Sequence, residues 1–261
     1  MKLLCALVVL CCALTTVGRA EWQVVSSAKD SSPNEMAKQW TTELRNPATN
    51  EQVTLQTVVF TTNRATLEVV DQGNTPRANL AETMLRINAL AGVNGGYFDP
   101  ADAPVGLLVS GGRMISPLRK AKLLTGVLYA SRSKVDVVRK TGFAMSDRVR
   151  AAVQCGPLLV EHNAPVRGLN ETRAARRTFA AVDGKGRVLL GVSSAISLAQ
   201  MGQVLCRTNA SGDFNVMRAL NLDGGSSSAF WFAGKEQTIS NQESKVVRDF
   251  IAVVPASRSV P

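Results

Sequence analysis

Histidine is almost absent from this chain, because His162 is the single copy among 261 residues. A Ser-His-Asp or Cys-His hydrolase would have to place its base there, and a histidine-rich metal site is excluded. His162 lies in a predicted surface hairpin, where a solvated side chain is the ordinary state. Hydrolysis would therefore rest on carboxylates, arginines, backbone amides or an oxygen-bound divalent cation such as calcium or magnesium; no other cofactor is indicated.

Cysteine is scarce once the N-terminus is set aside. Residues 1–20 contain one lysine, an apolar run over 3–14 and small residues at positions 18 and 20, which is typical of a secretory signal peptide. Its removal leaves Cys155 and Cys206, and this pair permits either one disulfide or two buried free thiols. The sequence thus predicts a secreted or periplasmic protein that begins near Glu21.

Long apolar runs, linkers and repeats are missing after residue 20. No segment of the mature chain is apolar for long enough to span a bilayer, so we expect no transmembrane segment. Because no Pro/Ser/Gly-rich stretch divides the chain, we predict a single domain over residues 21–261.

Acidic residues are outnumbered by basic ones, 20 against 30, which gives a formal net charge of +10. Such a balance favours anionic partners, including phosphorylated glycans, teichoic-type polymers, nucleic acid and acidic lipid. The basic residues are scattered apart from a cluster at Arg173, Arg176 and Arg177, and only 5% of residues are aromatic. Specific nucleic-acid recognition is therefore disfavoured, because no base-stacking platform is apparent.

Strand signals outnumber helix signals along the chain. Strands are predicted over 52–60, 65–70, 216–222, 228–232 and 246–254, and hairpins over 107–115, 158–166 and 179–192. Amphipathic spacing predicts one helix over 79–90, capped by Asn79, and a second that begins after a Ser197–Gln200 capping box. We expect an α+β fold of mostly antiparallel, curved or paired β-sheets packed against two or three helices.

Two loops share an unusual pattern, in which a short apolar run ends in Asn or Asp followed by two glycines. They are Asn94-Gly95-Gly96 and Asp223-Gly224-Gly225. Paired glycines allow a positive φ and close approach of the backbone to a ligand. Each loop alone could be an ordinary hairpin turn. Together they predict one site.

Five motifs around these loops follow one another in a family's order. They occupy residues 94–98, 106–112, 156–159, 177–180 and 222–225. On these residues the chain resembles the phosphodiester glycosidase family, most strongly over 91–254. The resemblance implies an α+β domain that releases a sugar from a phosphodiester. The chain departs from the family pattern at Ser226, where a third glycine is common, and at 193–195, where Ser-Ser-Ala replaces an Asp-Gly step.

The residue types in these motifs suit such a reaction. Asp223 could act as base, nucleophile or cation ligand, and the amides of Gly224, Gly225, Ser226 and Ser227 could form an anion nest. Asn94, with Gly95 and Gly96, would orient a sugar hydroxyl or a phosphate oxygen. Arg177 offers a planar fork to phosphodiester oxygens, although an ordinary surface arginine is the alternative.

Glycoside cleavage usually needs a second carboxylate. Asp99, Asp102 and Glu161 are the candidates, and Asp99 is preferred because it adjoins the Asn94 motif. The leading hypothesis is an exported hydrolase that cleaves a sugar from a phosphodiester-linked glycoside, with a phosphorylated carbohydrate or anionic glycopolymer as substrate. The alternatives are a non-catalytic binder of anionic polysaccharide and a scaffold in which the motifs are structural.

Overall fold

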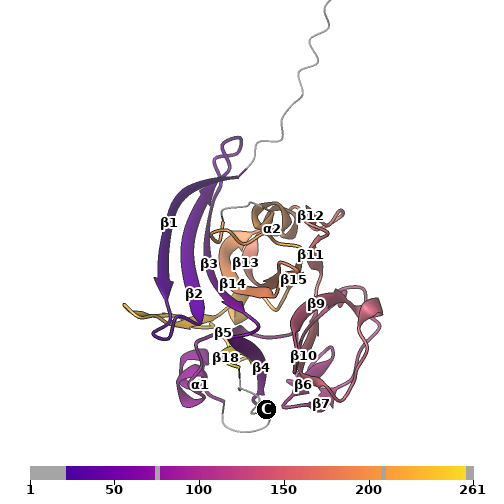
Figure 1. Ribbon diagram of the computed structural model, residues 1–261. Coiled ribbons are helices and arrows are strands. Elements are labelled where there is room, and N and C mark those ends of the chain that lie inside the picture. The colour runs from indigo at the N-terminus through magenta and orange to yellow at the C-terminus, as the bar shows by residue number, and fades with distance from the viewer. Residues whose placement is uncertain (1–21, 74–76, 207–209, 257–261) are drawn as a thin grey trace, which may run out of the picture.

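The computed structural model describes residues 22–73, 77–206 and 210–256. The signal peptide predicted for residues 1–20 lies outside this part of the chain. Within it, three β-sheets make up most of the fold, and every pairing between neighbouring strands is antiparallel. The described residues form two α-helices beside these sheets, and Figure 1 shows how the sheets are arranged.

The first sheet has eight strands. In spatial order they are β1 (Gln23–Ser31), β2 (Ala37–Arg45), β3 (Gln52–Thr61), β14 (Arg187–Ile196), β13 (Ala175–Val182), β15 (Arg218–Asn221), β11 (Leu158–Glu161) and β12 (Ala164–Pro165). Strands β1 to β3 form a long curved meander at one side of the molecule (Figure 1).

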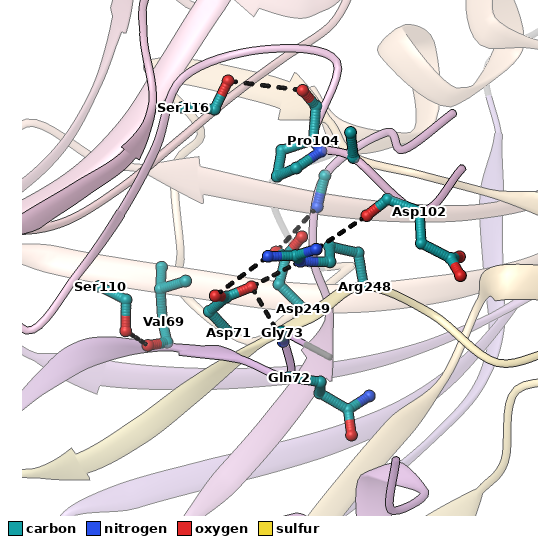
Figure 2. Close-up of polar contacts among 12 residues, drawn as sticks. Val69, Asp71, Gln72, Gly73, Asp102, Pro104, Ser110, Ser116, Arg248 and Asp249 are labelled. Carbon is teal, nitrogen blue, oxygen red and sulfur yellow. Dashed lines mark hydrogen bonds and ion pairs between the residues drawn. The ribbon is translucent and has the colours of Figure 1, made fainter. Parts of the chain in front are cut away.

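The other two sheets have five strands each. One has the order β17 (Thr238–Asn241), β16 (Phe230–Ala233), β5 (Ala91–Asn94), β18 (Asp249–Pro255) and β4 (Ala65–Asp71). The third has the order β7 (Arg113–Ser116), β6 (Leu108–Ser110), β10 (Val149–Cys155), β8 (Gly126–Ser131) and β9 (Val135–Arg139). A hydrogen bond of 2.7 Å from the Ser110 hydroxyl to the Val69 carbonyl joins the third sheet to β4 (Figure 2).

The main hydrophobic core lies where the three sheets face one another. It contains Phe60 of the first sheet, Phe230 and Ile251 of the second, and Leu128 and Val153 of the third. Central strands are buried on both faces: in β18, Ile251 and Val253 belong to this core, whereas Phe250 and Ala252 pack on the opposite face in the cluster that contains Leu80 and Met84. The loops between sheets are therefore held from several sides, and the two glycine loops are among them.

The helices contribute less than the sequence predicted. α1 (Leu80–Arg86) packs Leu80 and Met84 against the second sheet, and α2 (Leu198–Leu205) packs Met201 and Val204 against the first. Both begin with the predicted capping boxes. The expected packing of sheets against two or three helices is wrong in emphasis, because in the described residues the sheets mainly cover one another. The first helix stops short of residue 90, since Asn88 has a φ of 57°, which ends the helical turn.

Candidate active site

The two glycine loops meet, as the sequence predicted. The Asp223 amide donates to the Gly95 carbonyl at 3.1 Å, and the Asn94 side-chain amide donates to the Asp223 carbonyl at 2.8 Å. Asn94 ends β5, while Asp223 follows β15 by two residues. Two hydrogen bonds thus hold Asp223 against the Asn94-Gly95 segment, although Asn94 and Asp223 are 129 positions apart in the sequence.

Asn94 is part of the support of this site. Its side chain is fully buried, and its Oδ1 accepts hydrogen bonds from the Thr178 hydroxyl at 2.7 Å and the Ala229 amide at 3.0 Å. With Nδ2 on Asp223, both polar atoms are engaged by the protein. Asn94 therefore holds three segments together, and the direct substrate contact predicted for it would require these bonds to open.

Gly95 is required by the close approach of Asp249, and Gly96 by the close approach of Val153. The Gly95 amide donates to the Asp249 carbonyl at 2.9 Å, and the Gly96 amide donates to its Oδ1 at 3.2 Å. A Cβ atom on Gly95 would collide with that carboxylate, and one on Gly96 would press against Val153. Neither glycine has a positive φ; Gly225, in the other loop, does, at 65°.

Asp223 is the carboxylate that stays accessible at the junction. It is half-buried, and its Oδ1 accepts the Gly224 amide at 3.0 Å. Burial raises the pKa of the Asp223 carboxyl above its ordinary value, while the Ser227 hydroxyl, the Gly224 amide and Lys245 offset part of that rise. A carboxylate in such surroundings is suited to base or nucleophile chemistry.

The predicted anion nest is smaller than four amides. The Gly224 amide is bound to Asp223, and the Ser227 amide donates to the Gly224 carbonyl at 3.3 Å, within a single 3₁₀ turn over Gly225–Ser227. In the described part of the chain, the amides of Gly225 and Ser226 have no partner. These two remain able to bind an anion next to Asp223.

Arg177 lies deeper than an arginine in an open cleft. It is only 8% exposed, its Nε donates to the Ile196 carbonyl at 2.9 Å, and its Nη2 donates to the Arg173 carbonyl at 2.6 Å. Both predictions for Arg177, an ordinary surface arginine and a guanidinium presented freely to a substrate, are therefore wrong. Nη1 is the nitrogen without a partner among the described residues, so Arg177 could contact a phosphate from a fixed position.

Asp249 is a site residue that the sequence analysis missed. It is 1% exposed, and its Oδ2 is buried without a hydrogen-bond partner in the described structure. Burial, with smaller effects from Asp71 and Asp223, raises the pKa of Asp249 to about 7. The sequence could have indicated Asp249, because it directly precedes the apolar run at 250–254 and burial of an unpaired carboxylate is costly.

An ion-paired arginine lies next to Asp249. Figure 2 shows Arg248 between Asp71 and Asp102: its Nε is 2.6 Å from Asp71 Oδ1, and its Nη1 donates to the Asp102 carbonyl at 3.0 Å. The Asp102 carboxylate is paired with Arg77 at 3.0 Å. Asp102 thus serves an ion-pair network at the border of the site.

Tyr97 and Asn221 close the other side of the junction, and they too were not predicted as site residues. The Tyr97 hydroxyl donates to the Gly156 carbonyl at 2.6 Å and accepts from Asn221 Nδ2 at 3.0 Å. Burial raises the pKa of Tyr97 well above its ordinary value, so it is a neutral donor at physiological pH. The aromatic of the Asn94 motif therefore connects both loops to the 156–159 motif.

The remaining candidates lie elsewhere or serve their own loops. Asp99 Oδ1 accepts the amides of Ala101 and Ala103, both at 2.9 Å, and so shapes an exposed turn. Glu161 binds Arg139 in a bidentate pair that lowers the Glu161 pKa. It ends β11 opposite Arg218, at the far end from Gly156, so the Glu161 carboxylate is engaged by Arg139 and is not beside Asp223. His162 is exposed, as expected.

Neither a disulfide nor a metal cluster is present in the described residues. Cys155 is buried beside Tyr97 and Asp223, whereas Cys206 follows α2 and lies near Asn163; both are free thiols. The bridge allowed by the sequence is therefore absent, and the alternative of free thiols applies, with Cys206 only partly buried. No three His, Cys, Asp or Glu side chains of the described ranges come together as metal ligands.

A cavity of about 640 Å³ lies beside Arg176, a neighbour of the Asp223 loop. Arg176, Ser193 and Asn241 are among its lining residues, and the Arg176 carbonyl lies against Gly224. Ser193 stands where the family pattern has the Asp-Gly step, and its hydroxyl is buried without a partner among the described atoms. The lining contains no carboxylate and one cation, so the cavity suits a hydroxylated or anionic group.

The fold and the junction define a strand-rich protein with a half-buried carboxylate held where two glycine loops meet. The family model for phosphodiester glycosidase matches residues 88–254, nearly two thirds of the chain. The chain therefore belongs to the phosphodiester glycosidase family, and the resemblance drawn from the five motifs is confirmed.

Solved structures share the fold at low sequence identity. The catalytic domain of zebrafish N-acetylglucosamine-1-phosphodiester alpha-N-acetylglucosaminidase, auto-inhibited by its pro-peptide, superposes with a TM-score of 0.65 at 14% identity and covers 88% of each chain. A hypothetical protein of Synechocystis gives 0.60 at 16% identity, covering 84% of this chain and 62% of its own. A protein of Burkholderia pseudomallei K96243 gives 0.57 at 15% identity, covering 79% and 75%.

One curated relative matches a short stretch. The uncharacterised protein YigE of Escherichia coli (strain K12) is 35% identical over 77 residues, which are 27% of this chain and 30% of YigE. The chain thus spans less than a third of that relative. Separately, no helix in the described residues is both long and apolar enough to cross a membrane.

Proposed function

We propose that this protein is an exported hydrolase that cleaves a sugar from a phosphodiester-linked glycoside. The observation that carries the proposal is Asp223, an accessible carboxylate with a raised pKa, fixed by Asn94 and flanked by two unpartnered amides. Family membership gives the reaction class, and the predicted signal peptide gives the export.

In the proposed reaction, Asp223 acts at the anomeric carbon, either directly as nucleophile or as base toward water. The bond between that carbon and the phosphate oxygen breaks, water supplies the new hydroxyl, and the products are a free sugar and a phosphomonoester. A phosphate is a fair leaving group, so charge stabilisation matters more than acid assistance. In this proposal the amides of Gly225 and Ser226, together with Arg177 Nη1, supply that stabilisation.

Asp249 takes the place of the second carboxylate as a positioning residue. The Asp249 carbonyl and Oδ1 accept hydrogen bonds from the amides of Gly95 and Gly96. The Gly95 carbonyl in turn accepts the Asp223 amide, so Asp249 fixes the loop that holds Asp223. With a pKa of about 7, Asp249 is largely protonated in mildly acidic solution, which limits its repulsion of the Asp223 carboxylate. It supports Asp223 without reaching the substrate.

The test uses purified mature protein, residues 21–261, with a panel of UDP-sugars, teichoic-type polymers and synthetic phosphodiester glycosides. Free sugar and phosphomonoester should appear in equal amounts, and Asp223→Asn should release neither. An inactive parent on the whole panel would overturn the proposal. Parallel reactions with EDTA, calcium and magnesium test the predicted divalent cation.

The carboxylate-free cavity favours a second candidate, a non-catalytic binder of anionic polysaccharide. The binder and the hydrolase differ in what Asp223 does. Binding of a teichoic-type polymer that is the same in Asp223→Asn and in a parent without turnover supports the binder. Turnover in the parent that disappears in the variant supports the hydrolase.

A further inference from the structure

The net positive charge of this protein is concentrated in one part of the fold. Residues 104–155, which contain the third sheet, hold ten Lys and Arg residues and two Asp residues, a net charge of +8. Removal of Lys2 and Arg19 with the predicted signal peptide lowers the net charge of the chain from +10 to +8, so residues 104–155 account for the whole net charge of the mature chain. Basic residues do occur along the whole mature chain, but outside residues 104–155 acidic residues balance them, so the rest of the mature chain carries no net charge.

Exposed apolar side chains gather in the same segment. Of the eight large hydrophobic side chains that are exposed in the described structure, five lie between residues 104 and 155. They are Val105, Met114, Leu118, Leu123 and Met145. Single exposed apolar residues are ordinary, but a concentration of them beside basic residues indicates an interaction surface.

The two features coincide in residues 117–123, here called the basic loop. Leu118 and Leu123 are 42% and 67% exposed, and Arg119, Lys120 and Lys122 between them are exposed as well. None of these three cations forms an ion pair with any described residue. Their charge is available to a partner.

The backbone of the basic loop is fixed while its side chains stand in solvent. The buried Gln154 side chain accepts the Arg119 amide at 2.9 Å and donates to the Arg119 carbonyl at 2.8 Å. Lys140 Nζ adds a hydrogen bond of 2.7 Å to the Ala121 carbonyl. A loop ordered by buried polar contacts loses little entropy when its exposed side chains bind a surface.

We propose that the basic loop docks this protein onto the surface of an anionic phospholipid bilayer. Lysine and arginine side chains would meet the headgroups, and Leu118 and Leu123 would enter the boundary with the acyl chains. The leucines favour lipid over a soluble anionic polymer, because a polymer would use the charges and gain little from two exposed leucines.

Docking of this kind places the Asp223 site beside the bilayer. The Leu123 carbonyl lies so close to Gly156 that a side chain there would collide with it, and the Gly156 carbonyl accepts the Tyr97 hydroxyl. On the proposed function, the substrate would then be a sugar phosphodiester presented at a membrane surface. The docking itself needs no catalysis.

The experiment is co-sedimentation of the mature protein with phosphatidylcholine vesicles, with and without phosphatidylglycerol. Binding should require phosphatidylglycerol and weaken as salt rises. Arg119→Gln with Lys120→Gln and Lys122→Gln should weaken it about 100-fold, and Leu118→Ser with Leu123→Ser about tenfold. The control Val25→Ser with Leu85→Ser changes two apolar side chains elsewhere that are 61% and 66% exposed, and it should bind as the parent does.

Two results would overturn the docking proposal. One is equal binding to both kinds of vesicle. The other is a leucine variant that binds vesicles like the parent while a soluble teichoic-type polymer competes fully, which would make the loop a polymer site. Asp223→Asn should bind vesicles unchanged, so a failed glycosidase assay and failed docking remain separate outcomes.

Discussion

The Asn94 and Asp223 loops have the same sequence pattern, an apolar run, one amide or acid side chain and two glycines, yet they differ in burial and in role. Asn94 is sealed and has both polar atoms bound by the protein, whereas Asp223 is half-buried and flanked by two unpartnered amides. The Asn94 loop supports the junction, and the Asp223 loop presents an accessible carboxylate. The shared motif therefore accounts for the shared location, whereas the burial and hydrogen bonds of each side chain determine its role.

The largest effect on the supporting loop is expected from the protonation of Asp249. Its folded pKa of about 7 exceeds the ordinary value of 3.8, so the folded state binds the proton more tightly. The stabilisation is complete below pH about 4 and is lost as pH rises through 7, by roughly 4 kcal/mol. Urea unfolding at several pH values should show this loss in the parent and a flatter profile in Asp249→Asn. The exposed Asp147→Asn is the control; identical profiles for parent and Asp249→Asn would contradict the account.

Removal of the Asn94 side chain should break the supporting loop directly. Asn94→Ala leaves the buried Thr178 hydroxyl and Ala229 amide unpaired, which should cost about 3 kcal/mol of unfolding free energy. Asp223→Ala, on the accessible loop, should cost less than about 1 kcal/mol, because surface-facing changes are usually small. Denaturant unfolding compares the two. Equal losses would erase the distinction between the loops.

Arg177 connects the two roles, so its replacement should affect both stability and turnover. Arg177→Lys loses the bonds to the Ile196 and Arg173 carbonyls, about 1–2 kcal/mol, and should lower turnover roughly tenfold. Both interpretations of the sequence, a fork presented to a phosphodiester and a surface arginine, left this side chain unburied, where its replacement would change stability little. Thermal melting and sugar release measure the two effects. Exposed Arg113→Lys is the control, and a variant that matches the parent in both would remove Arg177 from the site.

A smaller effect should sharpen the role of Asp223. The Ser227 hydroxyl lowers the pKa of Asp223, so Ser227→Ala should raise that pKa and move the acidic limb of kcat/KM to higher pH. Ser226→Ala should leave the limb in place, since that exposed hydroxyl does not bind Asp223. A pH–rate series on all three proteins decides. No shift in Ser227→Ala would place the titrating group elsewhere.

Much of the fold could be predicted because strong local signals were present. Both capping boxes, the tight hairpins and the strands at 52–60 and 65–70 follow from turn chemistry and alternation. Strands β1, β2, β8, β9, β10 and β17 had no predicted counterpart. Several lie at edges or carry charged residues between apolar ones, so their pairing is set by neighbours distant in sequence. The balance of sheets over helices depends on the same long-range packing.

The site was predictable in location and only partly in composition. Two Asn/Asp-Gly-Gly motifs indicated one junction, and the structure brings them together. Asp249, Tyr97 and Asn221 join it through long-range contacts that no spacing reveals, and Glu161 is drawn away by Arg139. Asn94 and Arg177 lie at the junction as predicted, but both are buried and most of their polar atoms are already bound by the protein. The sequence does not reveal this burial.

The central claim is that Asp223 performs the chemistry on a framework that Asn94 holds. The most direct measurement compares sugar release and unfolding free energy in the parent and in Asp223→Asn, which keeps the size of the side chain. The account predicts that turnover falls at least 1000-fold, roughly 4 kcal/mol of transition-state stabilisation, while the unfolding free energy changes by less than about 1 kcal/mol. An Asp223→Asn protein that retains the parent's turnover would contradict it.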